Sequence, residues 1–372
     1  RAKGIDVINL SLGEPDFDTP IQIKEAAKKA IDENYSHYTP VAGYADVRQA
    51  VCDKLKRENG LDYEPGQIVL STGAKQCIAN TVLAIVDAGD EVIIPTPYWV
   101  TYSEIVRLAG GKVNLVKTTI ENGFKITASQ LEAAITKKTR LFMFSSPCNP
   151  SGAVYSKDEL AALVGVFTKH PQVYILSDEI YEHINYEGTH ESIAQFDDIK
   201  SRVILINGLS KAYAMTGWRL GYMACNKEIA AACDKLQGQF TSATCSITQR
   251  AAIAALTGTM EPTQKMLAEF RERRAAVLSL IKEIPGLKCS EPPGAFYIFP
   301  DVSSYFGKIK PGGETIADAD DLCMYLLHEA HVSTVSGKGF GEPACIRISF
   351  ANNLPNIEKG FAKIKKALGA LQ

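Results

Sequence analysis

The residues most suggestive of chemistry are Lys211 and Arg219, which stand eight positions apart after a short apolar run. This run, Val203 to Ile206, is rich in β-branched residues and predicts a buried strand. A lysine in a loop of small residues at a strand end lies where open α/β sheets bind ligands. In a partly dry pocket its amine could attack a carbonyl to form an imine, and the guanidinium of Arg219 suits a phosphate. The pair predicts a site for a phosphorylated aldehyde, of which pyridoxal 5′-phosphate is the commonest.

A lone lysine in a polar turn is usually solvated, so this interpretation needs partners at other strand ends. Asp178 follows the apolar run Tyr174 to Ser177, and Tyr181 comes three residues later. A buried carboxylate can keep a pyridine nitrogen protonated, and a phenol can hydrogen-bond the ring hydroxyl. Asp178 could instead be a helix N-cap, and the sequence leaves both readings open.

Two loops offer further binding groups. Gly73-Ala74-Lys75 lies between a predicted strand and a buried helix, where backbone N–H groups bind phosphate, although such a turn is also ordinary. The loop Ser146 to Gly152 contains two prolines and would hold the Asn149 amide toward a ring oxygen or a carboxylate. Its Cys148 could be a nucleophile, but no histidine stands nearby in sequence.

Trp99 and Arg347 complete the candidate site. Trp99 follows another strand and could stack on a pyridine ring, or be a core residue. In the strand Cys345 to Phe350, alternation puts Arg347 opposite the apolar side chains. There it could bind an α-carboxylate with two hydrogen bonds, or be an exposed edge residue.

The composition excludes several classes of partner. The chain has 372 residues, 46% of them hydrophobic, and a net charge of −2 from 40 basic and 42 acidic residues. This balance favours neither nucleic acid nor a membrane surface as a partner. Nine single cysteines without a C-x-x-C pair indicate reduced thiols and a cytoplasmic protein, and no residue cluster predicts a metal site.

Strands alternating with helices predict an α/β fold with a mostly parallel sheet covered on both faces. We expect strands at 7–12, 68–70, 91–95, 139–145, 174–177, 203–206 and 219–224, and helices at 20–33, 45–59 and 76–86. After about Phe270 a long helix leads into a smaller α+β unit, with strands at 294–299, 332–335 and 345–350 and helices at 319–330 and 356–371.

The chain resembles the class I aminotransferases of fold type I, which use pyridoxal 5′-phosphate, and most of all their bacterial aspartate branch. The resemblance spans nearly the whole chain in family order. It is carried by Gly13 to Phe17, Tyr38-Thr39-Pro40, Ser71 to Gln76, Ser146 to Gly152, Ser177 to Glu182, Ser210-Lys211 through Trp218-Arg219, and the Arg347 strand.

The resemblance implies a seven-stranded large domain at 21–269, and a small domain made of 1–20 and 270–372. It implies Lys211 as the Schiff-base lysine, with Asp178 and Tyr181 as its catalytic companions. Tyr38 would reach the cofactor phosphate of a neighbouring subunit, which implies a homodimer. The implied cofactor contacts are Tyr38, Gly73, Ala74, Lys75, Trp99, Asn149, Asp178, Tyr181, Ser210, Lys211 and Arg219, and the implied substrate contacts are Gly13, Trp99, Asn149 and Arg347.

The implied activity is transamination between an L-amino acid, with aspartate expected, and 2-oxoglutarate. Aromatic, prephenate or alanine aminotransferases and carbon–sulfur lyases on the same scaffold are the alternatives. One aspartate branch reads the side-chain carboxylate with an arginine in the segment matching 238–249, which here contains none. Acidic specificity is therefore expected from elsewhere, including a segment before Arg1. A ligand-sensing module of a transcription regulator is a further alternative, but the chain shows no basic helix-turn-helix domain.

Overall fold

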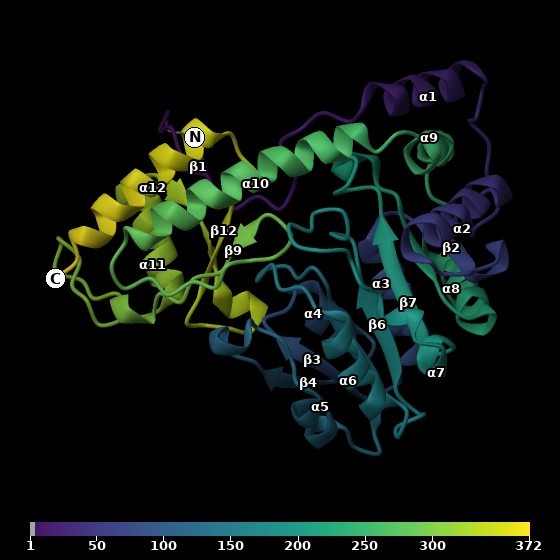
Figure 1. The fold of residues 1–372 in the computed structure, drawn as a ribbon, viewed down its shortest axis with the longest axis horizontal. Helices are drawn as coiled ribbons and strands as arrows, with labels where there is room; N and C mark the ends of the chain where they lie inside the picture. Colours follow the sequence, from purple (N-terminus) through teal and green to yellow (C-terminus); the bar gives the residue numbers. More distant parts are fainter. Residues whose placement is uncertain (1–3) are drawn as a thin grey trace.

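A seven-stranded sheet forms the centre of the larger part of the molecule in the computed structural model, which describes residues 4–372 (Figure 1). All neighbouring strands are parallel except where β8 runs against both of its neighbours. The mostly parallel α/β sheet of the prediction is confirmed. In spatial order its strands are β2 (Ile68–Ser71), β8 (Gly221–Ala224), β7 (Val203–Gly208), β6 (Tyr174–Asp178), β5 (Thr139–Ser145), β3 (Glu91–Thr96) and β4 (Lys112–Lys117).

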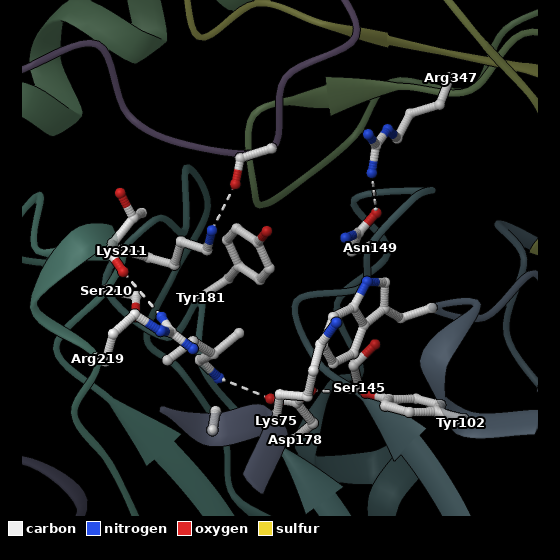
Figure 2. A pocket seen from close by; sticks show the side chains of 15 residues that line it. Lys75, Tyr102, Ser145, Asn149, Asp178, Tyr181, Ser210, Lys211, Arg219 and Arg347 are labelled. Carbon is white, nitrogen blue, oxygen red and sulfur yellow. Dashed lines mark hydrogen bonds between the residues drawn. The ribbon is translucent and has the colours of Figure 1, made fainter. Parts of the chain in front are cut away.

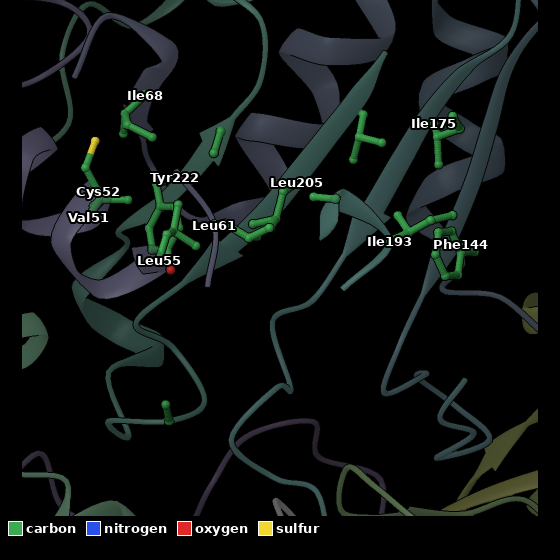
Figure 3. Close-up of a cluster of buried hydrophobic side chains, with 14 of the residues drawn as sticks. Val51, Cys52, Leu55, Leu61, Ile68, Phe144, Ile175, Ile193, Leu205 and Tyr222 are labelled. Carbon is green, nitrogen blue, oxygen red and sulfur yellow. The ribbon is translucent and has the colours of Figure 1, made fainter. Parts of the chain in front are cut away.

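Helices cover both faces of this sheet because its central strands are apolar on both sides. Phe142 and Phe144 of β5 lie in one buried cluster, whereas Leu141 and Met143 lie in the other. The first cluster, seen in Figure 3, packs against α2 (Ala45–Asn59), α6 (Lys157–Phe167) and α9 (Ser246–Thr257). The second packs against α3 (Ala74–Ile85), α4 (Thr101–Leu108) and α8 (Lys227–Phe240).

A smaller unit near both chain ends has its own apolar core (Figure 1). Phe270, Phe296 and Phe350 are fully buried there. Its strands are β9 (Tyr297–Ile298), β12 (Ile346–Ser349) and β11 (Val335–Ser336) in an antiparallel sheet, with β1 (Ile8–Asn9) and β10 (Val332–Ser333) paired separately. Its helices are α11 (Ala319–Tyr325), a π-helical turn at Leu326–Ala330, and α12 (Leu354–Gly369).

One long helix, α10 (Glu261–Lys282), runs from the larger part into the smaller unit (Figure 1). It begins nine residues before the predicted start at Phe270, with a proline in its first turn, where the missing N–H costs nothing. The predicted division between residues 269 and 270 therefore falls inside this helix, and the division into domains stays a prediction.

Several predicted boundaries were wrong for local reasons. The strand expected at 7–12 is only Ile8–Asn9, because the Asn9 side chain accepts a hydrogen bond from the backbone N–H of Ser11 and replaces the strand ladder there. The helix expected at 20–33 is α1 (Ile21–Asp32), since Pro20 has a non-helical backbone (ψ 141°) and is the N-cap rather than the first helical residue.

Three further boundaries differ from the prediction. Arg219 has a left-handed backbone (φ 56°), so β8 begins two residues later, at Gly221. The helix predicted from Gln76 starts at Ala74, which makes Gly73 its N-cap. The strand predicted at 332–335 is divided between β10 and β11, which belong to different sheets.

Within residues 4–372, no helix has both the length and the apolar character required to cross a membrane. All nine cysteines are free thiols.

Candidate active site

A cavity of about 290 Å³ opens beside the carboxyl ends of β5, β6 and β7, with walls from both units (Figure 2). Ligands bind at this edge of parallel sheets because the loops that leave the strands converge there. Eleven of the thirteen predicted site residues line it: Gly13, Ala74, Lys75, Trp99, Asn149, Asp178, Tyr181, Ser210, Lys211, Arg219 and Arg347. The residues lining it that the sequence did not single out are Tyr102, Ser145, Ile180 and Thr216.

Lys211 follows β7 and extends its amine into the cavity (Figure 2). The amine donates a hydrogen bond to the Gly13 carbonyl. The Tyr181 ring centroid lies 5.6 Å from this amine and the Phe296 centroid 5.9 Å. Burial among these groups lowers the pKa of Lys211 to about 8. A larger fraction of this amine is therefore neutral and nucleophilic near pH 8 than of an ordinary lysine.

Asp178 ends β6 on the floor of the cavity and is buried. Its Oδ2 accepts a hydrogen bond of 2.7 Å from the Tyr102 hydroxyl, and its Oδ1 accepts one from the Ile180 N–H. Burial raises the pKa of Asp178 to about 6, although both hydrogen bonds act to lower it. Such a carboxylate gains from a positive charge placed beside it, as a protonated ring nitrogen would be.

Gly73, Arg219 and Gly221 shape an anion site at the start of α3. Gly73 has φ +84°, and a side chain there would overlap the Arg219 guanidinium. A side chain on Gly221 would overlap the Ala74 backbone. The first N–H groups of an α-helix lack acceptors in a preceding turn, and the Arg219 guanidinium lies beside Gly73 at the start of α3, so this corner suits a phosphate.

Asn149 and Arg347 meet at the opposite side of the cavity. The Arg347 guanidinium donates a 2.8 Å hydrogen bond to the Asn149 side-chain oxygen (Figure 2). It donates a second one, also of 2.8 Å, to the Ser11 carbonyl. Only 7% of Arg347 is exposed, and its Nε has no hydrogen-bond partner. Arg347 therefore lies between the two units rather than on an exposed edge. Because it lines the cavity, its guanidinium can bind a carboxylate there.

Trp99 and Lys75 form the wall between these two corners. The Lys75 amine lies 4.8 Å from the Trp99 ring centroid, which is a cation–π contact. The Trp99 ring also meets Tyr102 edge to face, at 5.9 Å. Trp99 is only partly buried, and its ring is available to the cavity.

Two predicted residues are not in this cavity, and one alternative is disfavoured. Gly73 lies behind it as the N-cap of α3. Tyr38 is 98% exposed and lines a separate surface hollow with Thr39, Thr244 and Cys245. Cys148 is buried and burial raises its pKa, so its thiol is a poor nucleophile.

Tyr102 is the site residue that sequence reasoning missed most clearly. It lies on α4, a helix that the sequence did not delimit, and contacts a residue 76 positions away. Only its place three residues after Trp99 hinted at a role.

These residues fit pyridoxal 5′-phosphate, since an enclosed amine, a buried carboxylate and an anion corner match the aldehyde, ring nitrogen and phosphate. The fold and the site define a fold-type I enzyme of this kind. A family model described as "Aminotransferase class I and II" matches residues 5–364, and the chain belongs to this family. It is a pyridoxal-phosphate-dependent aminotransferase acting on amino acids and 2-oxo acids.

Curated relatives and solved structures agree with this assignment. The chain is 47% identical over 369 residues to the "Bifunctional aspartate aminotransferase and glutamate/aspartate-prephenate aminotransferase" of Petunia hybrida, covering 98% of the chain and 77% of that relative. It is 46% identical to the "Aspartate/prephenate aminotransferase" of Cereibacter sphaeroides, covering 98% and 92%. The aspartate aminotransferase structure from Rhizobium meliloti is similar with a TM-score of 0.97 at 43% identity, covering 100% and 93%.

Proposed function

We propose that the enzyme transfers the amino group of aspartate to 2-oxoglutarate. The observation that carries this proposal is the cavity in which the Lys211 amine shares one space with three further cations, Lys75, Arg219 and Arg347. Three anionic groups enter such a reaction, namely one phosphate and the two carboxylates of aspartate. Three cations besides the reactive amine match that number.

Each side chain has a role that follows from its place. When bound, the cofactor supplies an aldehyde for an imine with Lys211 and a ring that accepts electrons. Asp178 would hold the proton on the ring nitrogen, and Tyr181 would donate to the ring oxygen. The Lys211 amine, with its lowered pKa, would act as the base that takes the Cα proton of the substrate and holds it for return.

The remaining groups bind and orient. Arg219 and the N–H groups at the start of α3, with Ser210, hold the phosphate. Arg347 and Asn149, beside Gly13, hold the α-carboxylate, and Trp99 stacks on the ring. These contacts would hold the Cα–H bond of the substrate beside the Lys211 amine, so that this one base is already in place when the proton is transferred.

Lys75 is our candidate for reading the side-chain carboxylate. Its backbone belongs to the phosphate corner, but its amine lies over Trp99, on the side toward Asn149 (Figure 2). With Arg219 and Arg347 assigned to the phosphate and the α-carboxylate, it is the cation that remains. This assignment explains acidic specificity without an arginine in the segment 238–249.

A Lys75→Met variant tests this assignment. We expect kcat/KM for aspartate to fall by about 10- to 100-fold, because a hydrogen bond to a charged group contributes about 1.5–3 kcal/mol. Turnover of alanine, which has no second carboxylate, is the internal control and should change little. Equal losses for aspartate and alanine would contradict the assignment.

Prephenate is a second candidate substrate, favoured by the names of the Petunia and Cereibacter relatives. It also carries a second carboxylate, so the same lysine could serve it. A screen of oxo-acid formation from aspartate, glutamate, alanine and phenylalanine, together with amination of prephenate, separates the candidates. Activity with alanine or phenylalanine alone would contradict the proposal.

We further propose a cytoplasmic homodimer with a large domain at 21–269 and a small domain made of 1–20 and 270–372. Tyr38 supports the dimer, since it is 98% exposed and lies outside the cavity of its own chain, so that its hydroxyl is available to a partner. The nine unpaired thiols support a reducing compartment.

A further inference from the structure

Tyr297, a fully buried residue of β9, contacts three parts of the active site without lining the cavity itself. Its hydroxyl lies 2.8 Å from the Tyr181 hydroxyl, and its ring lies 4.6 Å from the Arg347 guanidinium. A Cβ atom added to Gly13 would lie 2.9 Å from the Tyr297 hydroxyl, so this hydroxyl lies close to the Gly13 backbone. The carbonyl of Gly13 accepts the hydrogen bond from Lys211. One phenol therefore adjoins the groups proposed for the imine, the ring oxygen and the α-carboxylate.

The contact joins the two units of the molecule. Tyr181 belongs to the loop after β6, whereas Tyr297 and Arg347 belong to neighbouring strands of the small sheet. The Tyr181 and Tyr297 rings also meet edge to face, with centroids 5.9 Å apart. A change at Arg347 can thus reach the Tyr181 hydroxyl through one rigid side chain.

The chemistry of the two hydroxyl groups determines which of them donates in the hydrogen bond between Tyr181 and Tyr297. The Tyr181 hydroxyl has one proton, and it must donate that proton into the cavity to bond a ring oxygen. It can do so only if Tyr297 is the donor in the bond between the two phenols. A phenol that accepts one hydrogen bond is also a stronger donor in the next.

We propose that Tyr297 is a positioning residue that directs the Tyr181 hydroxyl into the cavity and couples it to Arg347. This inference rests on the proposed function, because it assigns Tyr181 to the ring oxygen. Burial raises the pKa of both phenols, so both remain protonated across the working pH range. The pair acts by hydrogen bonding rather than by proton loss.

Tyr297→Phe tests this proposal, because it keeps the ring over Arg347 and removes one oxygen. Without its donor, Tyr181 donates less strongly to the ring oxygen, which then keeps more negative charge and holds the nearby imine proton. We expect the apparent pKa of the Lys211–cofactor imine to rise by about 0.5 to 1, the effect of losing one hydrogen bond. Absorbance titration of the holoenzyme measures it.

Two comparisons separate coupling from a general loss of structure. Tyr325→Phe removes a buried hydroxyl of the same apolar core, one that donates to the Ala367 carbonyl at 2.9 Å, and should leave the imine pKa unchanged. In a Tyr181→Phe background, Tyr297→Phe should have no further effect on it, since both changes break one chain of bonds.

An unchanged imine pKa in Tyr297→Phe would overturn the inference, as would equal shifts in the wild-type and Tyr181→Phe backgrounds. A shift of the same size in Tyr325→Phe would also overturn it. These outcomes leave the proposed function standing. A wild-type protein without any imine absorbance would overturn both.

Discussion

At the scale of single residues, the environment of Lys211 determines what its amine can do. The amine lies near two aromatic rings and one carbonyl, and burial lowers its pKa to about 8. Asp178 is held with its pKa raised to about 6 by burial. The site therefore combines an amine and a carboxyl group whose pKa values lie closer together than in water.

The Lys211 pKa predicts the pH dependence of cofactor capture. Only the neutral amine attacks an aldehyde, so the rate at which cofactor-free enzyme takes up pyridoxal phosphate should rise with pH and level off above about 8. An amine with an ordinary pKa near 10.4 would still gain rate between pH 9 and 10. Stopped-flow absorbance measures this, and a rate that keeps rising to pH 10 would contradict the assignment.

Residues placed by strand ends could be predicted from the sequence, whereas those placed by packing could not. Lys211, Asp178 and Asn149 follow apolar runs, and parallel strands bring such positions to one edge. Tyr102 and Tyr297 reach the site through contacts 76 and 116 residues apart in the chain. No local pattern distinguishes them from other buried tyrosines.

At the scale of elements, α2 holds the loop that carries Tyr181 and follows Asp178, the last residue of β6. Lys54 of α2 is 1% exposed and forms an ion pair with Glu182, which also accepts a 2.8 Å hydrogen bond from Asn59. Burial acts to raise the pKa of Glu182, but the Lys54 ammonium together with His183 and His190 outweighs it and holds that pKa far below its usual range. The Lys54 ammonium thus supplies the positive charge that the buried Glu182 carboxylate needs.

Lys54→Met should destabilise the protein by about 3–5 kcal/mol, because it leaves a buried carboxylate without its partner. In the wild type the Glu182 pair stabilises the fold above pH ~4.3 and loses that effect as pH falls. In the variant Glu182 must take up a proton to remain buried, which costs more at high pH. The decrease in the free energy of unfolding should therefore be larger at pH 8 than at pH 5.

Denaturant unfolding at the two pH values measures the difference. Lys56→Met, on the same helix but with an exposed side chain, is the matched control and should change stability little. A Lys54 variant as stable as the Lys56 variant would show that the pair contributes nothing.

Element types were easier to predict than element ends. The central strands can be recognised in the sequence from their apolar runs. The start of α10, in contrast, depends on packing that spans both units. The short β1 ends where an asparagine side chain competes with the backbone, and such competition depends on a rotamer that a sequence does not reveal.

At the scale of the whole molecule, we propose that a second copy of the chain completes the site. Tyr38 lies outside the cavity and is exposed. Its loop is held in place by the buried Gln249 amide, which donates to Thr39 and accepts from the Tyr44 N–H. A loop that Gln249 holds in place, and whose Tyr38 side chain is exposed, is well suited to contact a partner subunit.

Mixing two defective variants tests this arrangement. Lys211→Ala lacks the reactive amine, and Tyr38→Phe should weaken cofactor binding by about 10- to 100-fold through one lost phosphate hydrogen bond. If Tyr38 acts on the partner, each hybrid dimer contains one intact site, and activity at limiting cofactor should exceed the sum of the separate variants. No gain after confirmed subunit exchange would show that Tyr38 acts within its own chain.

The most direct test of the central claim is reductive trapping at Lys211. Wild-type enzyme incubated with pyridoxal phosphate and then borohydride should carry the cofactor on the peptide containing Lys211, and Lys211→Ala should carry none there. Peptide mass spectrometry reads the position. Cofactor attached to Lys75 instead, or a protein that stays colourless and unlabelled, would contradict the account.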